Sequence, residues 1–296
     1  MTTRAGFVAL IGEPNAGKST LLNRMVGAKV SIVTHKVQTT RARIRGVALE
    51  GEAQIVFVDT PGLFKPRRRL DRAMVAAAWG GAADADIVVM LIEAHRGISE
   101  GVKHILESLK GLNPDQKVAL AINKIDKVSD QEAEVVASNI QENFDFDDTL
   151  YVSALNGKGL QHLMDTVKEN IKAGPPFYPK DMLSEQPVRF FVAEMVREQL
   201  FLLYHQEIPY SATIEIVQYD ERDDLDYISA DIIVNRESQK GILIGKGGKA
   251  IKNLGKNARE VIEDFVDKKV YLDLHVKVRE KWREDPSRVR HYGYGN

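Results

Sequence analysis

Near its start the chain reads Gly12-Glu13-Pro14-Asn15-Ala16-Gly17-Lys18-Ser19-Thr20. A glycine, four residues and then Gly-Lys-Ser is the spacing of a phosphate-binding loop, because glycines permit tight turns that aim backbone N–H groups at phosphate oxygens. An apolar run over residues 6–11 precedes the loop and a helical pattern follows it. We therefore expect a strand, a loop and a helix N-terminus around a phosphate, with Lys18 at the β- and γ-phosphates and the Ser19 hydroxyl on Mg²⁺.

Around this loop, short apolar runs alternate with amphipathic stretches. Strands are predicted at residues 6–11, 53–58, 86–92, 118–122 and 150–152, with an edge strand at 41–49. Helices are predicted at residues 18–27, 70–82, 100–111, 131–143 and 160–172. This regular alternation predicts an α/β domain whose mainly parallel sheet carries helices on both faces.

The stretch Asp59-Thr60-Pro61-Gly62-Leu63 directly follows the predicted strand at residues 53–58. A carboxylate delivered there would enter the Mg²⁺ shell, and the Gly62 N–H would reach the γ-phosphate. Asp-x-x-Gly is short enough to occur by chance, so its value lies in its position after a strand and downstream of the phosphate loop. We predict that Asp59 is a metal ligand and that Gly62 contacts the γ-phosphate.

A second polar stretch, Asn123-Lys124-Ile125-Asp126, comes directly after the predicted strand at residues 118–122, at the sheet edge where α/β proteins bind ligands. The Asp126 carboxylate can accept from guanine N1–H and N2–H₂ together, whereas adenine would leave it unpaired. Asn123 would hold the loop or touch the purine edge, and the Lys124 stem would cover the ring. The alternative is a helix N-terminus capped by Asp126. Behind a phosphate loop, we predict guanine recognition.

A third stretch, Ser153-Ala154-Leu155, ends the last predicted strand. With it, four motifs occur in the order and spacing of Ras-like P-loop GTPases, and the resemblance covers about residues 6–172. The resemblance implies that the Ala154 N–H contacts guanine O6 and that GTP or GDP binds with Mg²⁺. The catalytic group that it implies consists of Lys18, Thr40, Asp59 and Gly62.

The switch threonine of such GTPases comes from the loop after the first helix. Here Gln38-Thr39-Thr40-Arg41 is the one good candidate. We choose Thr40 to complete the Mg²⁺ shell with Ser19 and Asp59, and Thr39 is the alternative. The sequence thus supplies three side chains with oxygen ligands, the ligand type that Mg²⁺ prefers.

Two residues set this chain apart from Ras itself. Leu63 stands where Ras-like proteins carry a water-orienting glutamine, and it cannot hydrogen-bond, so slow intrinsic turnover is expected. The chain therefore resembles bacterial GTPases with a hydrophobic residue there, several of which use a phosphate-loop asparagine to hold a monovalent cation. Our hypothesis is that Asn15 helps to bind K⁺. The alternative is that Asn15 only stabilises its loop.

A basic run, Arg67-Arg68-Arg69, lies where the second switch is expected. Charge runs in loops are usually solvated, and we predict that for this one. The alternative is that one of these arginines reaches the γ-phosphate or an RNA phosphate.

The proline-rich segment at residues 173–179 cannot continue a helix. We expect a first domain at residues 1–173, a linker at 174–187 and a second domain at 188–296. In the second domain the order is a helix at 188–205, strands at 211–218 and 227–235, a short helix into Ile244, a turn at 245–248, a helix to Val266 and a strand at 270–278.

The turn Gly245-Lys246-Gly247-Gly248 lies between two helices, so this order resembles an α+β KH domain of the bacterial type, type II. Such a turn lets backbone approach a single RNA strand closely, and the surrounding cations would hold its phosphates. The predicted RNA contacts are Arg236, Lys240, Gly245, Lys246, Gly247, Gly248, Lys249 and Lys252. Lys256 and Arg259 extend the same basic patch, which contains a single acid, Glu237.

A Ras-like domain followed by one KH domain, with Gln38-Thr39-Thr40-Arg41 in the switch, looks like the Era family of GTPases. The resemblance implies a GTP-hydrolysing switch that binds the 3′ region of 16S ribosomal RNA and acts in 30S subunit assembly and rRNA maturation. It also implies some peripheral association with the inner membrane. The alternatives are a GTP-regulated RNA or membrane adaptor in cell-cycle control with little turnover, and an ATPase or kinase if Asp126 does not read guanine.

Composition agrees with this interpretation without adding to it. The 41 Lys and Arg residues nearly balance the 42 Asp and Glu residues, so a nucleic-acid site must come from local clustering. The chain has no cysteine, which excludes disulfides and cysteine chemistry. No apolar run approaches the ~18 residues that a membrane span needs. We expect a cytoplasmic protein with no transmembrane segment.

Overall fold

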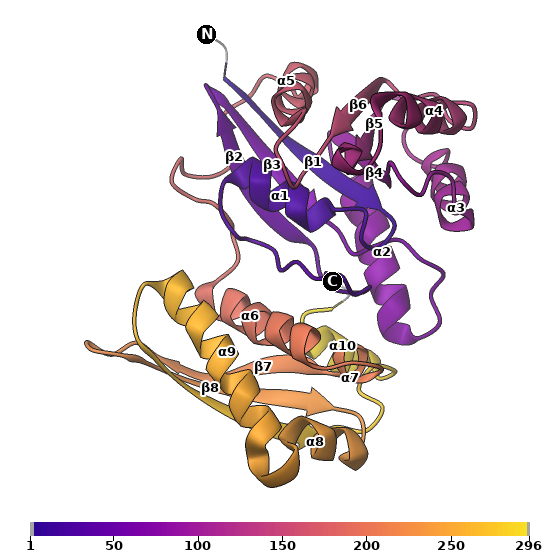
Figure 1. Ribbon diagram of the computed structural model, residues 1–296. Helices are drawn as coiled ribbons and strands as arrows, with labels where there is room; N and C mark the ends of the chain where they lie inside the picture. Colours follow the sequence, from indigo (N-terminus) through magenta and orange to yellow (C-terminus); the bar gives the residue numbers. More distant parts are fainter. Residues whose placement is uncertain (1–2, 295–296) are drawn as a thin grey trace. The chain divides into compact units, whose positions relative to one another are not determined.

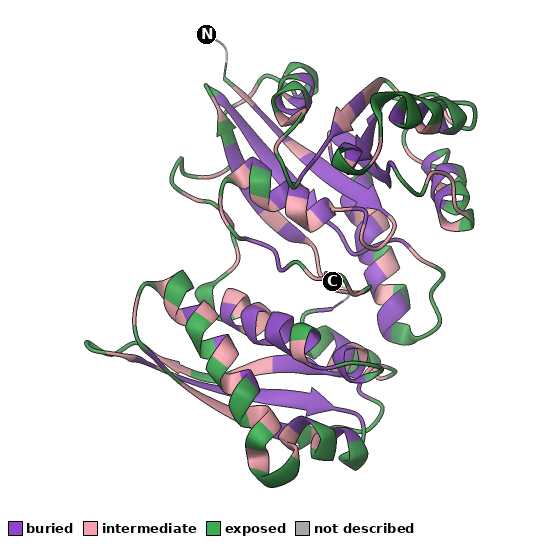
Figure 2. Cartoon of the chain, viewed as in Figure 1, coloured by how far each residue is buried: buried purple, intermediate pink, exposed green. Residues whose placement is uncertain are grey.

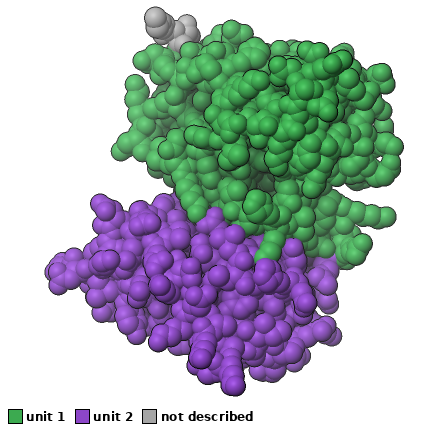
Figure 3. Space-filling view, in the orientation of Figure 1, with its two compact units in different colours: residues 1–67, 71–185 green, residues 68–70, 186–296 purple. Residues whose placement is uncertain are grey.

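The computed structural model describes residues 3–294. It divides into two compact units, residues 1–67 with 71–185 and residues 68–70 with 186–296 (Figure 3). Each unit has a hydrophobic core of its own.

The first unit is built on a six-stranded sheet with the order β2-β3-β1-β4-β5-β6, in which only β2 is antiparallel. Its strands are β1 (Arg4–Gly12), β2 (Ile44–Glu50), β3 (Ala53–Asp59), β4 (Ile87–Glu93), β5 (Lys117–Asn123) and β6 (Asp148–Val152). Its helices are α1 (Lys18–Val26), α2 (Arg69–Ala83), α3 (Glu100–Leu109), α4 (Asp130–Gln141) and α5 (Leu160–Asn170), with a 3₁₀ turn at Ile125–Lys127. The Ras-like fold prediction is confirmed.

Helices cover both faces of this sheet, α1 and α5 one face and α2, α3 and α4 the other (Figure 1). Every residue of β3 and β4 is buried, because a parallel strand covered on both faces meets no water (Figure 2). The central strands therefore read as unbroken apolar runs in the sequence. The polar residues that matter for function come where these strands end.

The edge strand predicted at residues 41–49 begins later, at Ile44. Ile44 pairs with Asp59, which is the last residue of β3. Because β3 ends there, it has no residue left to pair with residues 41–43. Those residues instead belong to the loop that carries Thr40. The prediction of the strand was right and its first boundary was wrong.

The segment after α5, predicted as a linker from residue 174, packs along β2 up to residue 185. The Val47 N–H donates to the Leu183 carbonyl at 2.9 Å, and the Ser184 hydroxyl donates to the Arg45 carbonyl at 2.6 Å. Arg45 pairs with Glu185 at 2.9 Å. An edge strand leaves backbone groups unpaired, and this segment satisfies some of them. The domain limits 1–173 and 188–296 remain predictions.

The second unit is a three-stranded sheet with helices on one face (Figure 1). Its elements are α6 (Val188–Leu203), α7 (Ile208–Ser211), β7 (Thr213–Asp220), β8 (Asp226–Val234), α8 (Glu237–Ile244), a 3₁₀ turn (Lys246–Gly248), α9 (Lys249–Val266), β9 (Val270–Val278) and α10 (Pro286–His291). β8 pairs antiparallel with β7 and parallel with β9. This is the predicted α+β arrangement. The sequence did not reveal α7 and α10, which are too short to show a helical period.

Candidate functional sites

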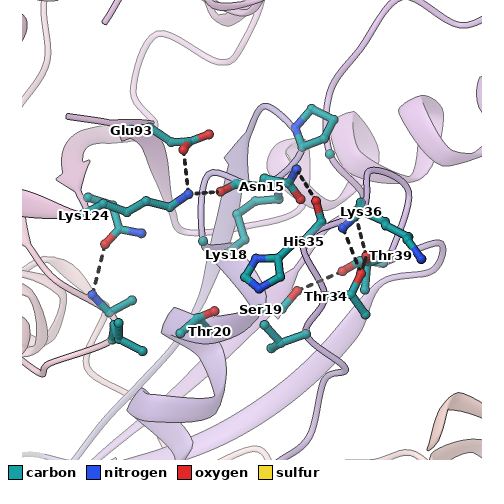
Figure 4. A pocket seen from close by; sticks show the side chains of 18 of the residues that line it. Asn15, Lys18, Ser19, Thr20, Thr34, His35, Lys36, Thr39, Glu93 and Lys124 are labelled. Carbon is teal, nitrogen blue, oxygen red and sulfur yellow. Dashed lines mark hydrogen bonds and ion pairs between the residues drawn. The ribbon is translucent and has the colours of Figure 1, made fainter. Parts of the chain in front are cut away.

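A pocket of about 450 Å³ opens at the edge of the first sheet where β1, β3, β4, β5 and β6 all end. Figure 4 shows side chains from the phosphate loop, the loop after α1 and the ends of β4 and β5 directed around it. The predicted nucleotide-binding residues that line the pocket are Pro14, Asn15, Gly17, Lys18, Ser19, Thr20, Gly62, Asn123, Lys124, Asp126, Ala154 and Leu155, together with Thr40. The structure thus brings residues from every predicted motif to one cavity.

Two glycines of the phosphate loop have no substitute. Gly12 has φ +148°, and a Cβ there would lie 2.5 Å from the Leu91 carbonyl oxygen. Gly17 has φ +100°, and a Cβ there would lie 2.2 Å from the Asn123 amide nitrogen. Both backbone conformations suit only glycine, and both approaches leave no room for a methyl group. The loop therefore packs against β4 and against the loop that begins at Asn123.

Lys18 is buried at the centre of the pocket. Its ammonium donates to the carbonyls of Gly12 at 3.1 Å and Glu13 at 3.0 Å, and no carboxylate is bonded to it. Burial lowers the pKa of Lys18 to about 8, against the opposing charges of Asp59, Glu13 and Glu93. A buried ammonium held by neutral carbonyls is stabilised when an anion binds, so the site is suited to phosphate.

Four oxygen-bearing side chains, those of Ser19, Ser31, Thr40 and Asp59, converge near Lys18. The Ser19 hydroxyl donates to Asp59 Oδ2 at 2.6 Å and lies 2.9 Å from the Thr40 hydroxyl. The Ser31 hydroxyl also donates to Asp59 Oδ2, at 2.9 Å. Asp59 Oδ1 is buried and has no hydrogen-bond partner, and burial raises the pKa of Asp59 despite nearby Lys18. An orphaned carboxylate oxygen beside two hydroxyls fits a hard cation such as Mg²⁺.

The two candidate switch threonines point in different directions. Thr40 is 7% exposed and its hydroxyl lies 3.4 Å from Asp59 Oδ2, within the oxygen cluster. The Thr39 hydroxyl instead donates to the Lys36 carbonyl at 2.7 Å and lies 2.6 Å from the Thr34 hydroxyl. The Thr39 hydroxyl therefore stabilises its own loop, and Thr40 is the threonine at the candidate metal site.

At the other end of the pocket, Asn123 joins two loops. Its amide nitrogen donates to the Ala16 carbonyl at 2.8 Å, and its oxygen accepts from the Ala154 N–H at 3.0 Å. Of the two roles considered for Asn123, the geometry fits holding the loops. The Ser153 hydroxyl donates to Asp126 Oδ1 at 2.5 Å, which fixes the carboxylate at the pocket wall.

Several predicted residues lie next to the pocket without lining it. Glu13 turns toward α3, where its carboxylate accepts from the Ser99 hydroxyl at 2.8 Å. Leu63 is only 4% exposed and belongs to the hydrophobic core, while its N–H donates to the Gly12 carbonyl at 3.0 Å. The predicted residues that do not line the pocket are Gly12, Glu13, Ala16, Asp59, Thr60, Pro61, Leu63 and Ser153. Of these, Asp59 still reaches the oxygen cluster through its carboxylate.

Sequence reasoning missed Glu93, the last residue of β4. Its carboxylate accepts from the Lys124 ammonium at 2.6 Å, while the same ammonium donates to the Asn15 carbonyl at 2.7 Å (Figure 4). Lys124 is thereby held across the pocket in a left-handed backbone conformation, φ +64°. A polar residue at the end of a buried strand was the signal, the same one that revealed Asn123. The pocket lining also includes His95 and Arg96, which carried no motif.

The glycine-rich turn of the second unit has the predicted form. Gly245, Gly247 and Gly248 all have positive φ, and a Cβ on Gly245 would lie 2.6 Å from the Ala250 methyl carbon. The predicted cations around the turn are exposed, except Lys240, which is half-buried. Beside the turn, a groove between α9 and β9 is lined by Ile251, Lys252, Asn253, Gly255, Lys256, Arg259, Leu272 and Leu274. The turn, the cations and the groove form one continuous surface of the second unit.

Comparison with known proteins agrees with this division. Residues 7–124 match the family described as 50S ribosome-binding GTPase, and residues 207–283 match the KH domain family. GTPase Era of Dinoroseobacter shibae is 56% identical over 293 residues, covering 98% of this chain and 95% of the relative. GTPase Era of Rhizobium meliloti is 52% identical over 292 residues, with 98% and 93% covered.

Solved structures give the same answer. Aquifex aeolicus Era bound to GDP and AlF₄⁻ superposes with a TM-score of 0.94 at 37% identity, covering 99% of this chain and 100% of that one. An Era complex with MgGDPNP and nucleotides 1506–1542 of 16S ribosomal RNA gives the same TM-score, identity and coverage. Two domain families match in the order that the sequence predicts, and the relatives are identical at about half of all positions. The chain belongs to the Era family of GTPases.

Proposed function

We propose that the pocket binds GTP with Mg²⁺ and that the chain hydrolyses this nucleotide as a molecular switch. The observation that carries the proposal is the buried Asp59 Oδ1, which has no hydrogen-bond partner among residues 3–294. The other oxygen of this carboxylate meets the Ser19 and Thr40 hydroxyls, and Lys18 is nearby. Mg²⁺ held there would neutralise charge on the β- and γ-phosphates. Era relatives solved with GDP and AlF₄⁻ and with MgGDPNP support the choice of ligand.

In this proposal the residues that line the pocket have distinct roles in binding the nucleotide. Lys18 holds the β- and γ-phosphates, the Gly62 N–H meets the γ-phosphate, and Asp126 reads guanine. The Leu63 side chain lies in the core and has no polar group, so it cannot orient the attacking water. Since water must be positioned by other groups, we propose slow intrinsic turnover that rests on charge stabilisation by Lys18 and the metal site.

Nucleotide affinity should fall as the pH rises through the Lys18 pKa of about 8. The charged ammonium binds phosphate and the neutral amine does not, so affinity is at its maximum well below pH 8 and is lost above it. For GDP, whose phosphates stay ionised, we expect a loss of about tenfold between pH 7 and pH 9. Isothermal titration calorimetry at each pH measures this loss of GDP affinity. In Lys18→Arg the guanidinium stays charged, so any remaining affinity should not depend on pH.

GTP hydrolysis should be faster in K⁺ than in Na⁺. The Asn15 amide nitrogen donates to the His35 carbonyl at 3.0 Å, which leaves the side-chain oxygen at the phosphate loop as a possible cation ligand. A cation there would stabilise developing charge, and we expect a rate difference of about tenfold. Asn15→Ala should abolish this difference between the two salts. Equal rates of the parent in K⁺ and Na⁺ would mean that Asn15 only holds its loop.

We further propose that the second unit binds single-stranded RNA through Gly245–Gly248 and the surrounding cations. The open turn allows close backbone approach, and the groove beside α9 offers apolar side chains to unstacked bases. The Era complex with nucleotides 1506–1542 supports the 3′ region of 16S ribosomal RNA as the target. A role in 30S subunit assembly and rRNA maturation follows from that target, with GTP setting RNA affinity and hydrolysis releasing the RNA.

Combined Lys246→Asp and Gly247→Asp should weaken RNA binding about 100-fold at ~0.1 M salt, because two carboxylates would face phosphates. Aspartate tolerates the positive φ of Gly247, so the turn should persist. Fluorescence anisotropy with a 16S fragment of nucleotides 1506–1542 measures the loss. Lys281→Asp is the control, an exposed lysine of the same unit that also has positive φ and lies outside the turn. Equal loss in the control would argue against the assigned surface.

The alternative function is an adaptor for RNA or a membrane that uses GTP with little turnover. Single-turnover hydrolysis with and without the 16S fragment separates the two, since an adaptor would turn over in neither condition. Within residues 3–294, no helix combines the length and apolar character that a membrane span requires. We propose that the chain, as a GTPase, is located in the cytoplasm, with peripheral attachment to the inner membrane.

A further inference from the structure

A cluster of cations extends from the loop after the candidate γ-phosphate glycine, Gly62, into the first turn of helix α2. Its exposed members Lys65, Arg67, Arg69 and Arg72 are here called the switch cations. Across residues 3–294 none of these four side chains has an ion pair. The chain as a whole is nearly neutral, with 41 basic and 42 acidic residues. Four cations without an ion pair within eight residues therefore form a local positive patch at residues 65–72.

The one acid in this stretch does not neutralise the patch. Asp71 is only 7% exposed and turns inward, where its carboxylate accepts from the Arg67 N–H at 3.0 Å and from the Gln38 amide at 3.3 Å. Its charge is thus used to hold the loop before α2 and the loop that contains Gln38. The switch cations are left facing solvent while their nearest acid supports the backbone beneath them.

The position of two of these cations is unfavourable for the protein alone. Arg69 is the first residue of α2, and Arg72 lies in its first turn. The N-terminus of a helix carries a partial positive charge, so a cation there is less favourable than a neutral residue. Anions bound to these side chains would remove that cost. A cluster that lowers helix stability and has no internal partner is better explained by an external polyanion.

The side chains also distinguish between kinds of polyanion. Three of the four switch cations are arginines, whose planar guanidinium binds phosphate oxygens in pairs. Membrane-surface segments add exposed apolar side chains that enter the lipid. This stretch offers none, since Leu63 and Leu70 are buried and Phe64 is half-buried. The chemistry fits a nucleic-acid phosphate backbone better than a lipid surface.

We propose that the switch cations are a second RNA contact, made by the GTPase domain with the phosphates of the RNA that the KH domain holds. This rests on the proposed RNA-binding function. The root of the segment touches the phosphate loop, since a Cβ on Gly62 would lie 2.8 Å from Pro14 and the Leu63 N–H bonds to the Gly12 carbonyl. Nucleotide binding at that loop can therefore alter how the cations are presented to RNA.

The test compares the salt dependence of RNA affinity for the full chain and for Arg67→Gln, Arg69→Gln, Arg72→Gln combined. The probe is the 16S fragment of nucleotides 1506–1542. Each phosphate contact to a single strand contributes about 0.7 to the slope of log affinity against log salt, so losing three reduces the slope by about 2. Between 50 and 200 mM salt the parent should therefore lose about 20-fold more affinity than the variant.

Two variants serve as controls. The first control combines Lys103→Gln, Lys110→Gln and Lys158→Gln. It removes three exposed cations of the first unit that already pair with acids, and it should keep the parent slope. Arg67→Lys, Arg69→Lys, Arg72→Lys combined retains the charges and should restore most of the slope. The glutamine variant should bind GDP like the parent and melt at the same or a higher temperature, because it removes cations from a helix N-terminus.

The outcomes separate this inference from the proposed function. A glutamine variant with the parent slope, while the Gly247→Asp double variant loses RNA, would overturn the inference and leave RNA binding by the KH domain intact. A parent that binds no RNA would overturn both. Vesicles of phosphatidylglycerol and phosphatidylcholine give the remaining comparison. If the glutamine variant lost vesicle binding with an unchanged RNA slope, the switch cations would belong to a lipid surface instead.

Discussion

Asp59→Asn should lower kcat/KM for GTP by about 100-fold or more, because it removes the carboxylate from the candidate Mg²⁺ site. Asp59 Oδ1 is a buried oxygen with no hydrogen-bond partner among residues 3–294, and an amide at this position is a poor ligand for a hard cation. The same change removes the nearest negative charge from Lys18. Since Asp59 raises the pKa of Lys18 against burial, the midpoint of pH-dependent nucleotide binding should move below 8.

Two measurements check this prediction, a Mg²⁺ titration of GTP hydrolysis and the pH profile of GDP affinity. Glu13→Gln is the matched control, because Glu13 also raises the pKa of Lys18 but its carboxylate faces Ser99 and not the oxygen cluster. It should move the pH midpoint in the same direction and leave the Mg²⁺ midpoint unchanged. If Asp59→Asn needed no more Mg²⁺ than the parent, the metal would have to be bound elsewhere.

The candidate metal ligands could be proposed because they follow buried strands. Asp59 ends β3 and Ser19 lies in the first turn of α1, so one motif each was enough to propose them. Thr40 could be chosen but not separated from Thr39 by sequence, since both are threonines in one polar loop. Only the fold of that loop distinguishes them, by turning the Thr39 hydroxyl onto Thr34 and Lys36. The GTPase and KH folds and the Era family were predicted correctly on the same motifs.

Contacts between distant segments could not be predicted. Glu93 reaches Lys124 because β4 lies beside β5 with Glu93 opposite Asn123, and this register exists only once the sheet has formed. The segment after α5 was interpreted as a linker from its prolines. One of its contacts with β2, between the Val47 N–H and the Leu183 carbonyl, uses backbone groups, which leave no pattern in the side chains.

Asp126→Asn should weaken GTP binding on the order of 10²–10³-fold, because two charge-assisted hydrogen bonds to guanine are lost and each contributes about 1.5–3 kcal/mol. The structure indicates which way the new amide would face. Ser153 donates to Asp126 Oδ1, so the corresponding oxygen of asparagine should stay toward Ser153. The amide nitrogen then faces the base as a donor. Xanthine carries a carbonyl at C2 where guanine carries an amino group, so the variant should prefer XTP.

Competition binding of GTP, XTP and ATP to the parent and variants measures this change in preference. Asp126→Ala provides the control for loss of charge, since it should lose GTP affinity without gaining any for XTP. Ser153→Ala removes the group that orients the side chain but keeps the carboxylate, so it should weaken GTP binding only modestly and keep the guanine preference. Unchanged GTP affinity in Asp126→Asn would refute the guanine assignment and reopen the ATPase or kinase alternative. A phosphate loop binds any nucleoside triphosphate, so in this proposal base selection depends on the Asp126 carboxylate together with the Ala154 N–H.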